Sequence, residues 1–260
     1  MKVVILCGGY GTRIRDVADN IPKPMIPIGE RPIIWHIMKY YATYGYIDFV
    51  LCLGYKGNVI KDYFLNYELC ASDITIELGA GRPSLEHVDF PEAGWKIVLA
   101  ETGINAMTGA RVRRIKKYIG EDPYFMLTYG DGVGDIDIDK LLRFHKSHGK
   151  MVTVTGVRPP GRFGELNVAE DNTVLGFNEK PQAGGGLING GFFVCNRDFF
   201  DYLSDDEGLV LEQDPMRNLV QDGQLKVFEH HGFWQPMDTF REYSLLNDLY
   251  KNNKAPWVKW

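Results

Sequence analysis

A glycine-rich loop with a cation at its end follows an apolar run at the start of the chain. The run 3–7 (VVILC) leads directly into the loop 8–13 (GGYGTR). Because glycine has no side chain, the backbone N–H groups of such a loop can approach phosphate oxygens closely. The loop differs from the dinucleotide fingerprint, which needs glycine where Ile14 stands, and from the P-loop, which needs a downstream Gly-Lys-Ser/Thr. We therefore predict a phosphate-binding loop that ends in Arg13, with a simple tight turn as the alternative.

A second cation, Lys23, lies ten residues after Arg13 in the segment 22–25 (PKPM). The two prolines restrict the backbone on either side of Lys23, so its ammonium group can be held in place at a low entropic cost. A lysine held in this way suits a phosphate contact. Alone, such a segment would more often be a surface loop. Next to the glycine-rich loop, it favours a functional role for Lys23.

A carboxylate between two glycines follows another apolar run. Asp131 comes after the run 124–129, in the segment Gly-Asp-Gly, where a hard cation and phosphates can both approach. We therefore expect Asp131 to bind a metal ion. The acidic segment 135–139 suggests a calcium loop, but Lys140 and Lys146 stand where an EF-hand needs glycine and glutamate. We interpret that segment as a loop and the start of a helix.

The elements that must position these groups alternate between strands and helices. A strand at 3–7, a helix that starts at Pro32 and ends before Gly45, and a strand at Phe49–Leu53 form a βαβ unit with parallel strands. Further strands are expected at 96–100, 124–129, 151–157, 165–169, 173–179, 187–194 and 225–230. Further helices are expected at 59–67, 109–119, 138–148, 197–203, 209–222 and 239–252. The stretch 68–95 stays unassigned.

This order of elements predicts an α/β fold. We expect a Rossmann-like open, mixed, mainly parallel sheet flanked by helices, with a smaller attached β region in the second half. No repeat or linker divides residues 1–260, so a single domain is expected. Ligands of open α/β sheets bind at the carboxyl ends of the strands, which here lead into 8–13, 54–57 and 130–132.

Composition narrows the range of partners. The 260 residues include 29 Lys and Arg against 34 Asp and Glu, a formal net charge of −5, which provides no general field for binding nucleic acid or an anionic membrane. No apolar run approaches the roughly 20 residues of a bilayer span. The four cysteines lie far apart and mostly in apolar runs, which indicates buried thiols in a reducing compartment. We expect a cytoplasmic protein with a small anionic ligand, no nucleic-acid partner and no membrane partner.

The chain resembles the sugar-1-phosphate nucleotidyltransferases. The resemblance rests on the segments 8–13 and 22–25 and extends over essentially the whole chain. Other segments look most like the members of this family that use CTP and glucose 1-phosphate; these segments are 54–57, 107–111, 160–164, 188–193 and 233–238. The resemblance implies the nucleotidyltransferase type of α/β fold, with a nucleotide-binding half at 1–150 and a sugar-phosphate-binding half at 151–260.

The resemblance also implies a reaction and a set of residues. A sugar phosphate oxygen would attack the α-phosphorus of CTP in line, giving CDP-glucose and pyrophosphate, with Mg²⁺ held by Asp131 and Asp238. The catalytic residues would be Arg13, Lys23 and Asp131. The expected nucleotide-binding residues are Leu6, Gly8, Gly9, Tyr10, Gly11, Thr12, Arg13, Lys23, Ala106, Thr108, Gly109, Arg111 and Gly130. The expected sugar-phosphate-binding residues are Tyr129, Glu179, Lys180, Asn189 and Gly190.

Several alternatives stay open at this point. Asp238 could cap a helix, the pair Glu179-Lys180 could form a solvated turn, and the cations at 111–117 could form a solvated helix face with Arg111 as the exception. UTP or dTTP could replace CTP, because cytosine and uracil differ chiefly by one donor against one acceptor. A regulatory paralogue that binds a nucleotide sugar without turnover is the non-enzyme alternative. By resemblance, we also expect a homo-oligomer.

Overall fold

A seven-stranded mixed sheet forms the centre of the computed structural model, which describes residues 1–10, 21–75, 84–85, 91–158, 165–168, 173–178 and 186–260. The strand order is β14-β10-β13-β8-β1-β4-β7. The strands span Leu225–His230 (β14), Val152–Val157 (β10), Ile188–Asn196 (β13), Tyr124–Tyr129 (β8), Val3–Leu6 (β1), Asp48–Leu53 (β4) and Lys96–Glu101 (β7). Within this sheet β13 runs opposite to its neighbours β8 and β10, and the other pairs are parallel. The predicted α/β fold with a mixed, mainly parallel sheet is confirmed, and strands from both halves of the chain share the sheet.

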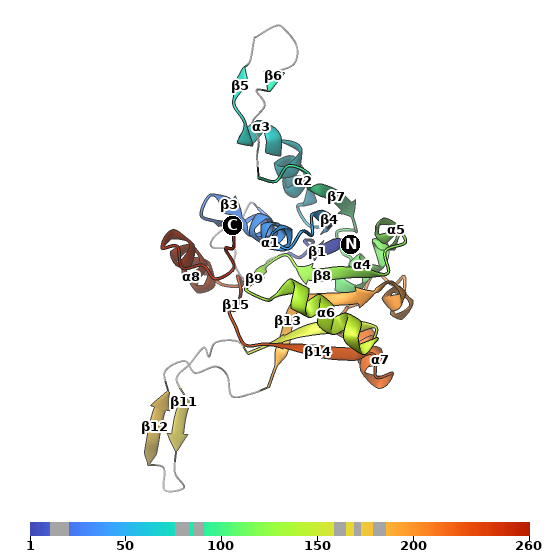
Figure 1. The fold of residues 1–260 in the computed structure, drawn as a ribbon, viewed down its shortest axis with the longest axis vertical. Coiled ribbons are helices and arrows are strands. Elements are labelled where there is room, and N and C mark those ends of the chain that lie inside the picture. The colour runs from blue at the N-terminus through green and yellow to red at the C-terminus, as the bar shows by residue number, and fades with distance from the viewer. Residues whose placement is uncertain (11–20, 76–83, 86–90, 159–164, 169–172, 179–185) are drawn as a thin grey trace.

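Helices cover both faces of this sheet (Figure 1). The α-helices span Ile33–Ala42 (α1), Gly57–Leu65 (α2), Tyr67–Ala71 (α3), Thr108–Arg114 (α4), Lys116–Ile119 (α5), Ile138–His148 (α6), Asp214–Gln221 (α7) and Phe240–Lys251 (α8), and the 3₁₀ helices span Lys23–Met25 (η2) and Arg197–Tyr202 (η3). Because successive strand residues point to opposite faces, Val3 and Ile5 pack with residues of α1, α6 and α8, whereas Val4 and Leu6 pack with residues of α4, η3 and α7. The first strand is therefore buried on both sides, as parallel strands between helical layers are.

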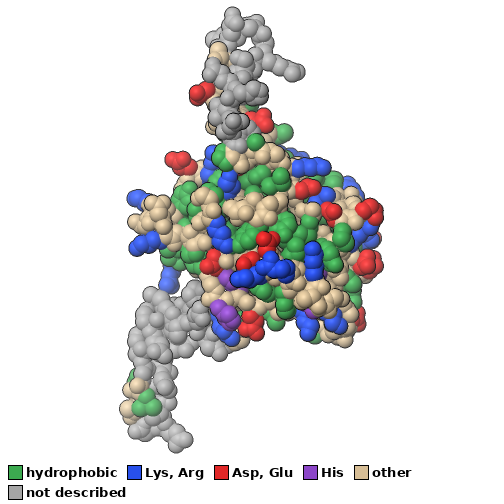
Figure 2. Space-filling view, viewed as in Figure 1, with side chains coloured by type: hydrophobic (Ala, Val, Ile, Leu, Met, Phe, Trp, Pro, Cys, Tyr) green, Lys and Arg blue, Asp and Glu red, His purple; other side chains and the backbone are tan. Residues whose placement is uncertain are grey.

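Short strand pairs lie outside the main sheet. They are β2 (Pro27–Ile28) with β3 (Arg31–Pro32), β5 (Ile74–Thr75) with β6 (Ser84–Leu85), β9 (Gly132–Gly134) with β15 (Trp234–Pro236), and β11 (Glu165–Val168) with β12 (Val174–Asn178). Figure 1 shows the β11–β12 hairpin projecting away from the sheet. In Figure 2, positive and negative side chains are interspersed over the visible face, in keeping with the small net charge.

The helices differ from the predicted ones in four places. The expected helix 59–67 is divided at Asn66 between α2 and α3, and the expected helix 197–203 is the 3₁₀ helix η3. The expected helix 109–119 is two short helices that meet at Ile115, and the expected helix 209–222 begins only at Asp214. Pro215 accounts for the later start, because proline lacks an N–H and fits the first turn of a helix, where no backbone partner is needed. The residues before it, 207–211, instead bond to the start of α4.

A buried histidine on α1 connects the strand β2, at Ile28, to Trp257 near the C-terminus. Nε2 of His36 lies 2.9 Å from the carbonyl oxygen of Ile28, which can only accept, so Nε2 carries the proton. Nδ1 of the same ring accepts a hydrogen bond from Nε1 of Trp257 at 3.4 Å. Burial, only partly offset by the bond to Ile28, lowers the pKa of His36 to about 4, so the ring is neutral at neutral pH.

We predict that the free energy of unfolding falls as the pH drops from about 6.5 toward 4, because the unfolded chain accepts a proton at His36 that the folded chain excludes. This group contributes on the order of 3 kcal/mol over that window. Urea unfolding at a series of pH values should give a weaker pH dependence for His36→Leu than for the wild type. The control His231→Leu, at an exposed histidine, should keep the wild-type dependence. The same pH dependence in all three proteins would contradict the prediction.

Candidate functional site

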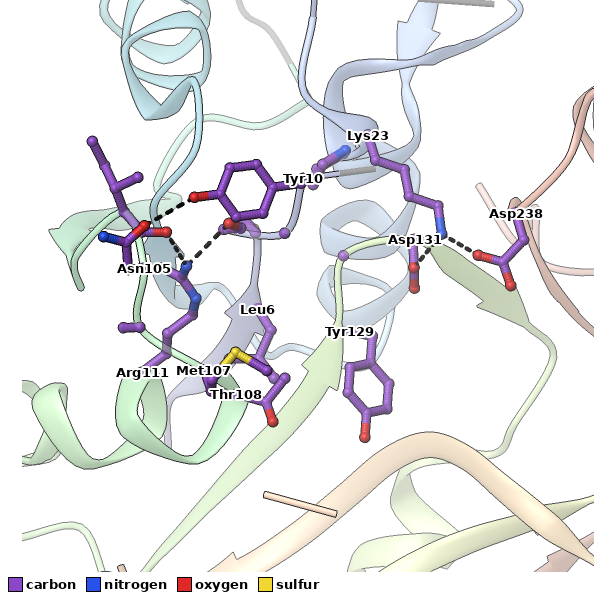
Figure 3. A pocket seen from close by; sticks show the side chains of 17 residues that line it. Leu6, Tyr10, Lys23, Asn105, Met107, Thr108, Arg111, Tyr129, Asp131 and Asp238 are labelled. Atoms are coloured by element: carbon purple, nitrogen blue, oxygen red, sulfur yellow. Dashed lines mark hydrogen bonds and ion pairs between the residues drawn. The ribbon is translucent and has the colours of Figure 1, made fainter. Parts of the chain in front are cut away.

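A cavity of about 450 Å³ opens at the carboxyl ends of β1 and β8 (Figure 3). Its walls are the segment 6–10 after β1, the segment 104–108 with Arg111 at the start of α4, and the segment 129–131 at the end of β8. Lys23 and Asp238 close one side. Ligands of open α/β sheets bind at this end of the strands, and the location agrees with the predicted position of the site.

A single ammonium group bridges two carboxylates at this side of the cavity. Nζ of Lys23 donates a hydrogen bond to Oδ2 of Asp131 at 2.5 Å and another to Oδ1 of Asp238 (Figure 3). Burial alone would lower the pKa of Lys23, but the two carboxylates outweigh it and hold the pKa above its ordinary value. The sequence placed these three residues far apart, and the fold brings them to one point.

Two backbone contacts carry Asp238 to the end of β8. The strand β15 pairs with β9, and the N–H of Met237 donates to the carbonyl oxygen of Asp131 at 2.8 Å. The N-cap of α8 is Thr239, whose side chain forms a capping box with Glu242. The alternative that Asp238 caps this helix is therefore wrong, and its carboxylate is left for Lys23.

The prolines on either side of Lys23 restrict its backbone, as predicted from the sequence. The backbone makes a single 3₁₀ turn, in which the N–H of Met25 donates to the carbonyl oxygen of Pro22 at 2.8 Å. Pro24 is buried and also lines the cavity. The lysine backbone is thus restrained before the side chain meets the two carboxylates.

The pair Asp131 and Asp238 suits Mg²⁺. Carboxylate oxygens are the protein ligands that Mg²⁺ takes, usually one or two of them together with waters and substrate phosphates. Both carboxylates already converge on one cation, the ammonium of Lys23. Among the described residues there is no cluster of three or more potential metal-binding His, Cys, Asp or Glu side chains, so these two carboxylates would share the ion with phosphate oxygens.

The guanidinium of Arg111 binds the start of the glycine-rich loop, at the carbonyl oxygen of Gly8. Its terminal nitrogens donate to the carbonyl oxygens of Leu53, Gly103, Gly8 and Ile104 and to the hydroxyl of Thr102, over 2.8 to 3.2 Å. The side chain is 5% exposed. Arg111 was expected to bind nucleotide; it lines the cavity, but in this structure its terminal N–H groups are taken up by loop acceptors. It therefore fixes the loops that follow β1, β4 and β7.

Of the predicted sugar-phosphate residues, the structure describes Tyr129, Asn189 and Gly190, and of these three Tyr129 lines the cavity. Nδ2 of Asn189 donates to the hydroxyl of Tyr129 at 3.0 Å, and Nε1 of Trp234 donates to the carbonyl oxygen of Gly190 at 2.7 Å. Gly191 has a φ of +82°, and a Cβ there would lie 2.4 Å from the Tyr129 ring. The strand β13 therefore needs glycine at this position so that the tyrosine can stand against it.

Most of the predicted site residues gather around the one cavity. Those that line it are Leu6, Gly8, Gly9, Tyr10, Lys23, Ala106, Thr108, Arg111, Tyr129, Gly130, Asp131 and Asp238. Gly109 does not line it and packs against Leu209 instead. Gly11, Thr12, Arg13, Glu179 and Lys180 lie outside the described residues.

Some residues of the site could not be found from sequence patterns. Asn105 lines the cavity and accepts a hydrogen bond from the hydroxyl of Tyr10 at 3.0 Å, across the cavity between two loops. Glu212 reaches Tyr129 from the loop before α7. Neither residue stands in a motif, because each is brought to the site by a loop whose course depends on the packing of the whole fold.

Several known proteins are similar to this chain in sequence or in fold. A family model described as nucleotidyl transferase matches residues 2–252. The chain is 48% identical to glucose-1-phosphate cytidylyltransferase of Salmonella typhi and 43% identical to the probable glucose-1-phosphate cytidylyltransferase of Bacillus subtilis (strain 168), over 100% of each chain. The crystal structure of HddC from Yersinia pseudotuberculosis superposes with a TM-score of 0.68 at 24% identity, over 96% of this chain and 99% of that one. This last likeness shows a shared fold.

We predict that Gly8→Ala destabilises the protein and Gly9→Ala does not. A Cβ on Gly8 would lie 2.2 Å from the Arg111 guanidinium, which cannot move without losing its bonds to the loops, whereas a Cβ on Gly9 would meet nothing within 4 Å. The overlap should lower the free energy of unfolding by about 1–3 kcal/mol for Gly8→Ala, against a change within about 0.5 kcal/mol for Gly9→Ala. Urea unfolding of the two variants measures the difference. Equal stability of the two would show that Arg111 does not fix the loop.

Proposed function

This chain belongs to the nucleotidyl transferase family, and on that basis we propose that it transfers the cytidylyl group of CTP to α-D-glucose 1-phosphate, giving CDP-glucose and pyrophosphate. The support comes from full-length relatives at 43% and 48% identity that carry this activity in their names. The observation within the molecule that carries the proposal is the convergence of Lys23, Asp131 and Asp238 beside the loop at Gly8. Cations and carboxylates gathered at a phosphate-binding loop are what a reaction between two phosphate compounds requires.

In the proposed reaction, an oxygen of the sugar phosphate attacks the α-phosphorus of CTP. The new bond forms as the bond from this phosphorus to the oxygen of the β-phosphate breaks, and pyrophosphate leaves with the electron pair. Such a displacement depends on positioning and on neutralising charge more than on acid or base groups. No covalent intermediate with the protein is needed.

Each residue group has a role in this scheme. The backbone N–H groups of the glycine-rich loop and Arg13 would hold the triphosphate, and Lys23 would stabilise the α-phosphate. Asp131 and Asp238 would hold Mg²⁺, which when bound neutralises charge on the phosphates. Tyr129, Asn189 and Gly190 would bind the sugar phosphate, together with Glu179 and Lys180.

The choice of nucleobase separates the main proposal from its nearest alternative. Cytosine presents an N4 donor where uracil and thymine present an O4 acceptor, a difference that backbone groups can recognise. The names of the full-length relatives favour CTP over UTP and dTTP. A regulatory paralogue would be expected to have lost a charged group, but Lys23, Asp131 and Asp238 are present and in contact.

The setting of the enzyme is part of the proposal. None of the described helices is both long enough and apolar enough to cross a membrane. We propose that the enzyme works in the cytoplasm, where CTP is available, and that it forms a homo-oligomer, as members of its family usually do.

We predict that pyrophosphate release in the presence of glucose 1-phosphate and Mg²⁺ is fastest with CTP. A site that hydrogen-bonds the N4 amino group leaves a buried polar group unpaired when UTP or dTTP binds, so kcat/KM should be at least about tenfold lower for these nucleotides. A coupled phosphate assay across CTP, UTP, dTTP, ATP and GTP measures this. Faster turnover of UTP or dTTP would assign the enzyme to the alternative class, and nucleotide binding without any release would indicate the regulatory paralogue.

We predict that Asp131→Asn and Asp238→Asn each lower kcat by about 10²-fold or more while the melting temperature stays close to that of the wild type. The reason is that an amide is a weaker ligand for Mg²⁺ than a carboxylate and leaves the positive charge of Lys23 unbalanced. Asp201→Asn, at a surface aspartate that faces Lys116, is the matched control and should keep wild-type turnover. Wild-type turnover of Asp131→Asn in Mg²⁺ would refute the metal assignment.

A further inference from the structure

Glu212 bridges two walls of the cavity with its side chain. The hydroxyl of Tyr129 donates to Oε1 of Glu212, and the hydroxyl of Thr108 donates to Oε2 at 2.7 Å. Tyr129 and Thr108 both line the cavity and are labelled in Figure 3; in the proposed function Tyr129 would bind the sugar phosphate and Thr108 the nucleotide. The two oxygens of one carboxylate therefore connect the two parts of the site.

The loop that carries Glu212 is held without this carboxylate. The N–H of Met107 donates to the carbonyl oxygen of Glu207 at 2.9 Å, and the N–H of Ala110 donates to that of Leu209 at 3.1 Å. The N–H of Leu211 donates to the hydroxyl oxygen of Thr108 at 2.9 Å. Backbone hydrogen bonds thus fix the loop against the start of α4, so a change of the Glu212 side chain should leave the course of the loop intact.

The carboxylate determines the direction of a chain of hydrogen bonds. Oδ1 of Asn189 accepts from the N–H of Gly191 at 2.9 Å, which leaves Nδ2 to donate to the Tyr129 hydroxyl at 3.0 Å. A carboxylate can only accept, so the single hydroxyl proton of Tyr129 is given to Glu212.

Because the hydroxyl proton of Tyr129 is donated to Glu212, the hydroxyl can act toward a ligand only as a hydrogen-bond acceptor. A phenol oxygen has two lone pairs, and in Tyr129 one of them already accepts from Asn189. The remaining lone pair can accept a hydrogen bond from a hydroxyl group and cannot donate one. A sugar offers such hydroxyl donors on several of its carbons.

We propose that Glu212 is a positioning residue of the sugar subsite, which holds Tyr129 as a hydrogen-bond acceptor for one hydroxyl of the hexose phosphate. This inference rests on the proposed function and goes beyond it by naming the residue that sets the polarity of the subsite. Glu212 does not itself need to touch the substrate. Its loss releases the tyrosine proton, which can then point at the incoming hydroxyl and oppose it.

The test compares Glu212→Gln with the wild type on glucose 1-phosphate and on its 2-, 3-, 4- and 6-deoxy analogues. The amide has the size of the carboxylate but can accept at one atom only. We expect the KM for glucose 1-phosphate to rise about tenfold, which is the size of one lost hydrogen bond to a buried polar group, while the KM for CTP changes less than about twofold. For one deoxy analogue, which lacks the hydroxyl that bonds to Tyr129, the wild type and Glu212→Gln should differ by less than about twofold.

The matched control is Glu207→Gln, in the same loop. The Glu207 side chain faces Arg114 on the surface, and only its backbone contacts the start of α4. This variant should keep the wild-type KM for both substrates. Three results would overturn the inference: an unchanged KM for glucose 1-phosphate in Glu212→Gln, equal losses for both substrates, or the same loss on all four deoxy analogues.

An incorrect proposed function and an incorrect role of Glu212 can be told apart by experiment. If the wild type releases no pyrophosphate with any triphosphate and glucose 1-phosphate, the proposed function is wrong. The role of Glu212 is then decided by calorimetry with glucose 1-phosphate alone. Binding that is about tenfold weaker in Glu212→Gln supports the role, whereas equal affinity, or no binding by either protein, overturns it.

Discussion

Two carboxylates that face each other in a partly buried cavity need a cation between them. Several elements of this structure bring the two carboxylates and the cation together. Asp131 and Asp238 would repel each other if they shared the cavity wall alone, and the ammonium of Lys23 offsets this repulsion. An Mg²⁺ ion and this ammonium cannot both take the same position. In the proposed reaction, phosphate groups would draw Lys23 toward them, and the two carboxylates would then be free to hold Mg²⁺.

A second interaction maintains the shape of the cavity. The guanidinium of Arg111 donates hydrogen bonds to carbonyl oxygens in the loops after β1, β4 and β7. Among the described residues, these three loops share no other contact of this kind. Backbone carbonyls in such loops would otherwise face water or the ligand. Because the carbonyl oxygen of Gly8 points to Arg111, we propose that the N–H groups of the glycine-rich loop serve the anion. The two cations thus have separate tasks: Arg111 shapes the loops, and Lys23 faces the charged groups of the site.

The sequence allowed the sheet and the main charged residues to be predicted, because both leave local signals. The buried strands are short apolar runs, and the segments that hold Lys23 and Asp131 combine charge with proline or glycine. Side-chain partners could not be predicted in the same way. Arg111 bonds to carbonyl oxygens that have no side-chain identity, and Glu212 depends on where Pro215 delays the start of α7. The short pair of β9 and β15 was also missed, since three residues are too few for a pattern, and it is this pair that brings Asp238 to the site.

The pairing of β15 with β9 also makes the site depend on a part of the chain that is synthesised late. The walls of the cavity come mainly from residues that leave the ribosome early, together with the sheet strands β1, β4 and β8. The second carboxylate, Asp238, comes directly after β15, and its backbone N–H donates to Glu242 of α8. Its ion pair with Lys23 can therefore form only after most of the chain has left the ribosome.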